Sequence, residues 1–294
     1  MDYNTFLYKT RKGNKIEYHT CGPESGYPVL YMHGAVPMPF SKKLIQTAWE
    51  CNLYLIMVLR PGYGASSRVK YQSVYEYISL LKELIINLKL KRFDVLGLSA
   101  GSPYCYALAA ACPELVAGVN ICSGIPLVNI KKIYRMNTWQ ERFLFSLSKY
   151  LPANFIGKYG AWSMEAMERK KGWHATEDGV SMDVIFQKYV RPNWYGLGRS
   201  THLQYKNWGF DAVSIPKKVS IYHSKTDEMI PFNIAVKSAE LLSNSEVYEY
   251  DGEEHSSERL LRDALLNIAK ERLITCKCLS PRTNGIIYFL PQLF

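Results

Sequence analysis

The stretch that decides the fold is VLGLSAGSPY, residues Val95–Tyr104. The apolar run from Phe93 to Leu96 predicts a buried strand, and the Ala-rich run from Tyr104 to Cys112 predicts a helix. Between them lies a G-x-S-x-G sequence centred on Ser99, and a strand-to-helix turn is the context in which this pattern marks a nucleophile. Small residues suit so sharp a turn, because the two limbs of the chain nearly touch. The stretch predicts a nucleophilic Ser99; the alternative is a glycine-lined turn in which Ser99 has no chemical role.

Apolar strands and amphipathic helices alternate on both sides of this turn. A hairpin is expected first, at Thr5–Lys9 and Lys15–Thr20, and the alternation then runs to a strand at Val116–Cys122. It resumes with a strand at Lys218–His223 and ends with a helix at Ser257–Ile274. Such alternation produces right-handed β-α-β units. It predicts an α/β fold with a mostly parallel sheet covered by helices on both faces.

The alternation fails in the segment 128–210, where helices separated by proline or glycine are expected. They are Lys131–Tyr150, Ala161–Lys171 and Ser181–Val190. Sixteen of these 83 residues are aromatic, and the segment has 13 Lys or Arg against six Asp or Glu. We expect it to be a helical cap inserted into a core made of 1–127 and 211–274. The tail, 275–294, fits no pattern and is given no role.

Composition narrows the classes of partner. The chain has 294 residues and a formal net charge of +10, with its largest basic excess in the expected cap. Because no nucleic-acid-binding motif accompanies the basic and aromatic residues, we expect no nucleic-acid partner. An attraction of the basic cap to anionic substrates or surfaces stays open. No run approaches the roughly 18 apolar residues that span a bilayer, so no membrane span is expected.

Cysteine usage and the N-terminal residues both favour a cytoplasmic location. The seven cysteines are irregularly spaced and match neither a disulfide framework nor a zinc pattern, which fits a reducing compartment. Cys105, Cys112 and Cys122 lie in apolar segments and are expected to be buried. Cys276 and Cys278 are too few for a metal site. Residues 1–4 have neither the basic nor the apolar region of a signal peptide.

A nucleophilic serine needs a base, and in open α/β sheets the loops at the carboxyl ends of strands supply such groups. Of the six histidines, His255 lies between the last expected strand and the last expected helix. His255 is therefore the predicted base, and His223, at the end of a strand, is the weaker alternative. If His255 has no chemical role, it is a polar loop residue beside Glu253 and Glu254.

The base needs a carboxylate to fix its tautomer and to stabilise the imidazolium ion. Asp227 lies in the loop after the strand that ends at His223, and Asp251 and Glu228 are the alternatives. The strand that ends at Cys122 is followed by Ser-Gly-Ile-Pro, which offers no carboxylate. Asp227 is the predicted acid; otherwise it is a turn residue ahead of Pro231.

Two backbone N–H groups are needed to bind the oxyanion. One should be that of Ala100, because it directly follows the nucleophile at a helix N-terminus. The second should come from the loop after the expected Pro28–Met32 strand, where Ala35 is best placed.

These residues together resemble the α/β-hydrolase fold superfamily. The order Ser99, Asp227, His255 is that superfamily's order of nucleophile, acid and base, with the cap inserted before the acid. Tyr-Met-His-Gly at 31–34 and Arg-Pro-Gly-Tyr-Gly-Ala-Ser at 60–66 resemble the subgroup with an HG-x-P oxyanion loop and an RPGYGxS loop. The likeness covers residues 15–274. The chain departs from the subgroup's pattern at three positions: Pro37, Leu59 and Glu254.

The resemblance implies hydrolysis in two steps through an acyl-enzyme on Ser99, without a cofactor or a metal. A serine at this turn argues against epoxide hydrolase or dehalogenase chemistry, which similar folds perform with a carboxylate nucleophile. The aromatic cap favours a small-molecule carboxylic ester or similar acyl substrate with a hydrophobic part. The alternatives are an aminopeptidase-like or other α/β-hydrolase activity, and a catalytically silent binding or scaffold protein.

Overall fold

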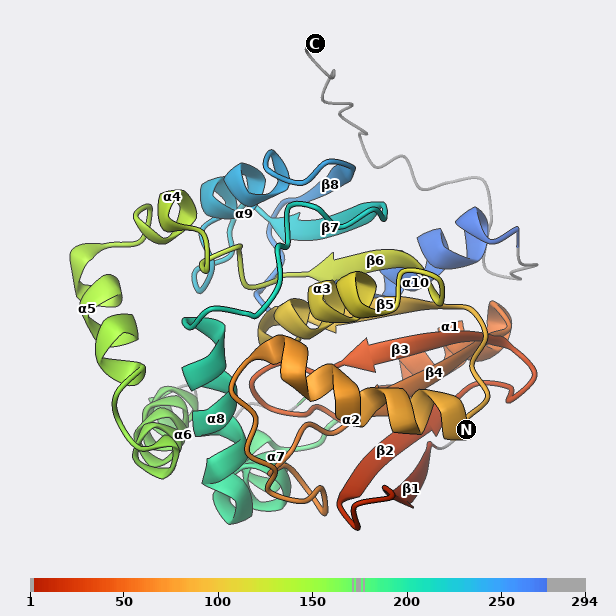
Figure 1. Ribbon diagram of the computed structural model, residues 1–294, viewed down its shortest axis with the longest axis horizontal. Helices are drawn as coiled ribbons and strands as arrows, with labels where there is room; N and C mark the ends of the chain where they lie inside the picture. The colour runs from red at the N-terminus through yellow and green to blue at the C-terminus, as the bar shows by residue number, and fades with distance from the viewer. Residues whose placement is uncertain (1–2, 171, 173–175, 177, 274–294) are drawn as a thin grey trace.

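The computed structural model describes residues 3–170, 172, 176 and 178–273, and they are built around one eight-stranded sheet (Figure 1). The strands in chain order are β1 (Asn4–Lys9), β2 (Lys15–Cys21), β3 (Tyr27–Met32), β4 (Leu53–Val58), β5 (Phe93–Leu98), β6 (Val116–Cys122), β7 (Val219–Ser224) and β8 (Ser245–Tyr250). Their order across the sheet is β1-β2-β4-β3-β5-β6-β7-β8. The hairpin β1–β2 and the pair β2–β4 are antiparallel, and all other pairs are parallel.

Helices cover both faces of the sheet, and each face has its own apolar core. α1 (Lys42–Glu50) and α10 (Glu258–Glu271) pack on one face, where Leu44 and Leu261 belong to the same core as Met57 of β4. The other face carries α2 (Val74–Asn87), α3 (Ser102–Ala111) and α9 (Phe232–Ala239). The central strand β5 is buried along its whole length. This arrangement confirms the predicted α/β class and the doubly covered, mostly parallel sheet.

Five further helices lie between β6 and β7, and they are called the α4–α8 segment below. They are α4 (Lys131–Tyr134), α5 (Trp139–Ser148), α6 (Ala153–Lys170), α7 (Met182–Tyr189) and α8 (Trp194–Gln204). The single helix expected at Lys131–Tyr150 is wrong. A new helix begins after Thr138, because Thr138 and Glu141 form a capping box, which marks the N-terminus of a helix.

The helix α8 was not expected, and α6 begins earlier than the predicted residue 161. Two glycines lower the helix propensity of α8 but allow it to approach α6 closely. A Cβ atom on Gly198 would lie 1.7 Å from the Ala153 carbonyl oxygen, and one on Gly157 would lie 1.8 Å from the Trp194 carbonyl oxygen. Backbone packing between the two helices therefore stabilises both, and single-segment periodicity contains no sign of it.

The cysteines only partly follow the expectation. Cys105, Cys112 and Cys122 are free and buried, as predicted, and Cys21 is as well. Cys51 is disulfide-bonded, which contradicts the absence of disulfides expected from the irregular spacing. Cys276 and Cys278, with the tail 275–294, lie outside the described residues. Among the described helices, none is long and apolar enough to cross a bilayer.

A buried ion pair joins the C-terminal end of α10 to the start of β5. The Arg272 guanidinium donates to both Asp94 carboxylate oxygens, at 2.7 and 2.8 Å, and the Tyr27 hydroxyl donates to Asp94 at 2.9 Å. Asp94 is buried, so its charge depends on these donors. The pair lies at the opposite end of β5 from Ser99, which indicates a role in stability.

We expect Arg272→Ala to lower the free energy of unfolding by about 3–5 kcal/mol, because it leaves the Asp94 carboxylate buried and without its cation. The measurement is urea unfolding followed by circular dichroism. Lys218→Ala is the matched control, since Lys218 pairs with Glu246 and Glu271 at the surface and should change stability by at most about 1 kcal/mol. Equal effects of the two variants would contradict the prediction.

Candidate active site

Ser99 lies at a sharp turn between β5 and α3. Its φ is +48°, in the left-handed region that few non-glycine residues occupy, and a short 3₁₀ turn, Ser99–Gly101, connects it to the helix. The turn packs tightly against the end of β3, because a Cβ atom on Gly101 would lie 2.1 Å from the Met32 carbonyl oxygen. The predicted strand, turn and helix are all present, with the serine at the tip.

The structure brings together the three residues predicted to act in catalysis. The Ser99 hydroxyl donates to His255 Nε2 at 2.9 Å, and His255 Nδ1 donates to Asp227 Oδ2 at 2.8 Å and to Oδ1 at 3.1 Å. This tautomer follows from the partners, because an ionised carboxylate only accepts. The three residues come from the loops after β5, β8 and β7, at the carboxyl edge of the sheet.

The carboxylate of Asp227 is buried and held in its charged form. Burial raises its pKa, but the hydrogen bond and the charge of His255 outweigh burial, so the net effect lowers the pKa below its usual value. The backbone N–H groups of Met229 and Ile230 also donate to Asp227 Oδ1, at 2.9 and 3.0 Å. Asp227 can therefore fix the tautomer of His255 and stabilise an imidazolium ion.

The alternative residues lie differently. His223 is buried in β7, where its Nε2 donates to the Ile230 carbonyl at 2.9 Å and lies 3.5 Å from Asp227 Oδ2. Burial lowers its pKa, which favours a neutral ring behind the carboxylate. Asp251 and Glu228 are exposed, and Asp251 lies 3.9 Å from the Lys225 ammonium. Of the candidate acids, Asp227 is therefore the one that the structure places on His255.

The two predicted oxyanion donors are Ala100 and Ala35. Ala100 is buried within the turn that follows Ser99. Ala35 comes directly after Gly34, and a Cβ atom on Gly34 would lie 3.7 Å from the Ser99 Cβ. Within the described part of the chain, neither backbone N–H has a hydrogen-bond partner. Both donors thus belong to loops beside Ser99 and are available to an oxygen atom.

Arg60 fixes the loop that carries Ala35, a role that the sequence did not reveal. Its side chain is buried, and it donates from Nη2 to the Gly34 carbonyl at 2.7 Å and from Nη1 to the His33 carbonyl. The guanidinium also lies over the ring of Tyr104, 4.9 Å from its centroid. Arg60 is therefore a positioning residue. In the sequence, the only sign of this role is that a cation directly follows an apolar strand.

The loop that contains Arg60 is also held from β2. The Glu17 carboxylate accepts from the Ala65 N–H at 2.5 Å, and the Ser66 hydroxyl donates to the Leu59 carbonyl at 2.8 Å. The departure at Leu59 from the RPGYGxS pattern therefore leaves the loop anchored, with a carboxylate supplied by a neighbouring strand.

His33 is a neutral buried histidine within the same loop. Its Nδ1 donates to the Gly34 carbonyl at 2.7 Å, and its Nε2 accepts from the Arg60 N–H at 3.2 Å. Burial and then the nearby Arg60 charge lower its pKa well below the ordinary value. Protonation would remove the acceptor that holds Arg60, so the loop geometry requires the neutral ring.

A pocket of about 240 Å³ opens onto Ser99 and His255. Its walls are mostly apolar, with Ile125, Val128 and Ile234 on the core side and Phe145 contributed by α5. Its polar wall side chains are the carboxylate of Glu141, the amide of Asn137 and the hydroxyl of Tyr205, all from the α4–α8 segment and the loop after it. No Lys or Arg of the described chain lines this pocket.

A larger cavity of about 750 Å³ lies between α7 and the segments 38–45 and 252–258, which include the starts of α1 and α10, but Ser99 does not line it. The smaller pocket is the one that reaches the reactive hydroxyl, so it is the candidate substrate site. In the described ranges, no group of three or more His, Cys, Asp or Glu side chains is placed to hold a metal ion.

Comparison with known proteins identifies the fold. Epoxide Hydrolase A from Mycobacterium thermoresistibile superimposes with a TM-score of 0.70 at 14% identity, over 94% of this chain and 100% of that chain. An esterase (EaEST) from Exiguobacterium antarcticum gives 0.67 at 19% identity, over 92% and 100%. Haloalkane dehalogenase DbeA from Bradyrhizobium elkani USDA94 gives 0.68 at 15% identity, over 92% and 99%. The chain has the α/β-hydrolase fold.

Sequence comparison gives a shorter match. The chain is 28% identical over 116 residues to a Bacillus subtilis (strain 168) protein named "Uncharacterized hydrolase YcgS", and the match covers 40% of this chain and 40% of that protein. No protein-family model matches the chain. The three structural neighbours named above share the α/β-hydrolase fold but are named for three different reactions. The fold therefore leaves the chemistry to the residues of the site.

Lowering the pH from 7.5 to 5.5 should reduce the free energy of unfolding by about 1.4 kcal/mol through His33 alone. Its pKa is lowered in the folded state, so the unfolded chain binds the proton first, and stability falls as the pH drops below about 6.5. The measurement is the urea midpoint and slope across this range for the protein and for His33→Asn, which cannot titrate.

The difference between the two pH profiles is the test, since His33→Asn also changes stability at every pH. His223 has a lowered pKa as well and contributes equally to both profiles. Parallel profiles would contradict a neutral, buried His33.

Proposed function

We propose that this chain is a serine hydrolase that cleaves a small-molecule carboxylic ester or similar acyl substrate through an acyl-enzyme on Ser99. The observation that carries the proposal is the chain of contacts from Ser99 Oγ to His255 Nε2, at 2.9 Å, and from His255 Nδ1 to Asp227, at 2.8 Å. Ser99 and His255 both line a mostly apolar pocket. A serine, its base and the group that orients the base are the elements of nucleophilic acyl transfer.

In the first step, His255 Nε2 takes the proton of the Ser99 hydroxyl while Oγ attacks the substrate carbonyl carbon. The carbonyl oxygen becomes an oxyanion, which the N–H groups of Ala35 and Ala100 bind; donors of this kind each contribute about 3 kcal/mol. Asp227 stabilises the imidazolium ion that forms. Protonated His255 then gives its proton to the leaving alcohol, and the ester bond breaks to leave the acyl group on Ser99.

In the second step, a water molecule repeats the same chemistry. His255 removes a proton from the water, and the resulting hydroxide attacks the acyl carbon on Ser99. The proton returns through His255 to Ser99 Oγ as the carboxylic acid leaves. Arg60 takes no part in proton transfer; it supports the donor loop by holding the carbonyls of His33 and Gly34.

The pocket walls favour a compact substrate with an apolar part. Ile125, Val128 and Phe145 offer apolar contact to an acyl or alcohol group, and the volume of about 240 Å³ limits its size. Glu141 and the absence of Lys or Arg among the described lining residues disfavour an anionic substrate. The basic excess of the α4–α8 segment therefore lies outside the pocket.

An aminopeptidase-like activity is the second candidate, and Glu141 is the observation that favours it. That activity needs an acidic residue in the α4–α8 segment to bind a substrate amine, and the Glu141 carboxylate lines the pocket. One of its oxygens, Oε2, already accepts from the N–H and the hydroxyl of Thr138, at 2.7 and 2.8 Å. Because the capping box uses this oxygen, an ester remains the first choice. A silent binding protein would have no use for the ordered triad.

A fluorophosphonate probe should label the protein, and Ser99→Ala should abolish labelling without changing the fold. Asp227→Asn should slow labelling by up to about 10⁴-fold, because the His255 tautomer is no longer fixed. Labelling rates are read on a denaturing gel, with urea unfolding as the check of folding. Failure of the folded protein to react would contradict a nucleophilic Ser99.

Ser123→Ala is the matched control for this experiment. Ser123 follows the neighbouring strand β6 and also has left-handed backbone, with a φ of +44°, but its hydroxyl is fully buried. This variant should therefore be labelled at the rate of the unchanged protein.

A panel of p-nitrophenyl esters should show higher kcat/KM for short neutral acyl groups than for a succinyl group. The Glu141 carboxylate repels the succinyl charge, so Glu141→Gln should raise the relative rate of the succinyl ester by about fivefold. Glu114→Gln, on an exposed loop, is the control that should leave the ratio unchanged. Faster hydrolysis of an arylamide with a free α-amine, lost in Glu141→Gln, would favour the aminopeptidase-like candidate instead.

A further inference from the structure

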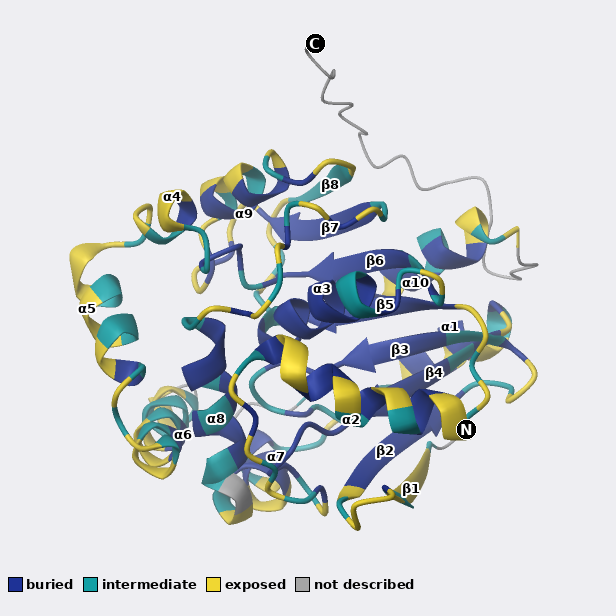
Figure 2. Ribbon diagram, in the orientation of Figure 1, coloured by how far each residue is buried: buried dark blue, intermediate teal, exposed yellow. Residues whose placement is uncertain are grey.

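Large apolar side chains are exposed on one end of the molecule. Among the described residues, ten of the 18 large apolar side chains that are exposed fall between positions 136 and 167. They include Trp139, Phe143 and Leu147 of α5 and Phe155, Tyr159 and Trp162 of α6, with Trp139 68% and Trp162 65% exposed. These six side chains define the α5–α6 apolar face. Both helices lie at the same end of the molecule, at the left in Figure 1, and Figure 2 shows exposed residues along each.

Helical periodicity places each set of three on one side of its helix. In α5 the spacing is i, i+4, i+8, and in α6 it is i, i+4, i+7. The other side of α5 is the one that packs, since the Phe145 ring stacks on Tyr205 with centroids 3.9 Å apart and Glu141 faces the pocket. The side chains of the α5–α6 apolar face are therefore separate from the contacts that hold α5 against the rest of the molecule. Large apolar side chains exposed together at one end of a molecule are typical of an interaction site.

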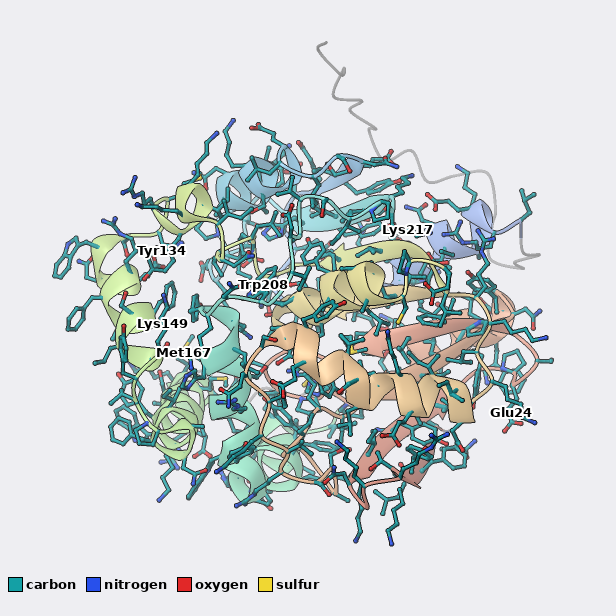
Figure 3. All side chains as sticks on the ribbon, viewed as in Figure 1. Glu24, Tyr134, Lys149, Met167, Trp208 and Lys217 are labelled. Carbon is teal, nitrogen blue, oxygen red and sulfur yellow. The ribbon has the colours of Figure 1, made fainter. Side chains whose placement is uncertain are left out.

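The charges around this face are positive. The stretch 131–170 has eight Lys or Arg and three Asp or Glu. Lys131, Lys132 and Arg135 are exposed, and no ion pair involves them within the described residues. Of the acids, Glu165 pairs with Arg191 at 2.8 Å, and Glu141 serves the capping box. The Lys149 ammonium lies 5.3 Å from the centroid of the Tyr134 ring at the same end (Figure 3).

We propose that the α5–α6 apolar face docks on the surface of an anionic lipid bilayer. Aromatic rings such as Trp139 and Trp162 suit the boundary between headgroups and acyl chains, and exposed Lys and Arg beside them attract anionic headgroups. Charge complementarity decides between occupants, because a second copy of this chain would bring one basic surface against another. Docking does not depend on catalysis at Ser99. It places the pocket wall formed by α5 next to the lipid, where apolar acyl compounds concentrate.

The test is co-sedimentation of the full chain with vesicles of phosphatidylcholine alone or mixed with phosphatidylglycerol. The unchanged protein should bind the anionic vesicles more strongly, and added salt should weaken the binding. A variant with Trp139→Ser, Phe143→Ser and Trp162→Ser should bind these vesicles at least about tenfold more weakly. The variant with Lys131→Glu, Lys132→Glu and Arg135→Glu should show a loss of the same size.

Matched controls change exposed residues of the same kind elsewhere on the molecule. The apolar control combines Leu7→Ser, Trp49→Ser and Ile86→Ser, and the charge control combines Lys12→Glu, Lys91→Glu and Arg92→Glu. Both controls should bind anionic vesicles within about twofold of the unchanged protein.

Three outcomes overturn the proposal. The first is no binding of the unchanged protein to anionic vesicles, and the second is an equal loss of binding in the face variants and their controls. The third is a dimer, seen by light scattering, that dissociates on substitution of Trp139, Phe143 and Trp162 while the unchanged protein does not bind vesicles. The last result would assign the face to contact between two copies. Fluorophosphonate labelling of each variant in solution separates this question from the proposed hydrolase activity, since labelling requires Ser99 and not the face.

Discussion

A serine held at a φ of +48° between a buried strand and a helix is strained by about 1–3 kcal/mol, and the contacts around it must impose that geometry. Gly97 and Gly101 allow the chain to approach itself: a Cβ atom on Gly97 would lie 2.8 Å from the Cys105 sulfur, and one on Gly101 would meet the Met32 carbonyl. Relaxation of this turn would carry the Ser99 hydroxyl away from His255 Nε2. In the proposed mechanism, the base, the acid and the pocket depend on this turn, because it presents Ser99 Oγ at that point.

The loop that carries Ala35 depends on the charge states of two buried residues: Arg60 is buried as a cation, and His33 is buried as a neutral ring. Arg60 is buried among carbonyl oxygens and aromatic rings, and the neutral ring of His33 accepts its backbone N–H. Burial, and then the nearby charge of Arg60, lowers the pKa of His33, so the ring stays neutral beside this cation. The permanent charge of Arg60 lies directly beneath the loop of Ala35. Through these contacts Arg60 holds the loop that carries Ala35, the predicted second oxyanion donor.

The core could be predicted from the sequence because short-range patterns determine it. Strand β6 was expected at Val116–Cys122 and has these bounds in the structure, and the loop positions of Asp227 and His255 followed from where strands end. Most errors arose where distant segments determine the structure, whereas the missed helix boundary at Thr138 depends on a local capping box. Helix α8 contains Gly196 and Gly198 and is stabilised by α6, and Arg60 has its role only through carbonyls 26 and 27 residues away. Glu141 illustrates the same limit, because it lies within the single helix expected at Lys131–Tyr150 and only the fold places it in the pocket.

Helix α5 connects the chemistry of the pocket to the surface of the molecule. Its inner side provides Glu141 and Phe145 to the pocket, and its outer side exposes Trp139, Phe143 and Leu147 to solvent. Packing holds it through the Phe145–Tyr205 stack and through the Tyr134 hydroxyl, which contacts the Arg142 carbonyl at 2.7 Å and the Ser146 hydroxyl at 2.9 Å. Exposed apolar area is unfavourable in water by about 25 cal/mol per Å². A surface that covered the outer side of α5 would therefore stabilise the position of α5 in which that side is covered. The same ten-residue helix forms part of the pocket wall, so the proposed docking contact and the space at Ser99 depend on one element.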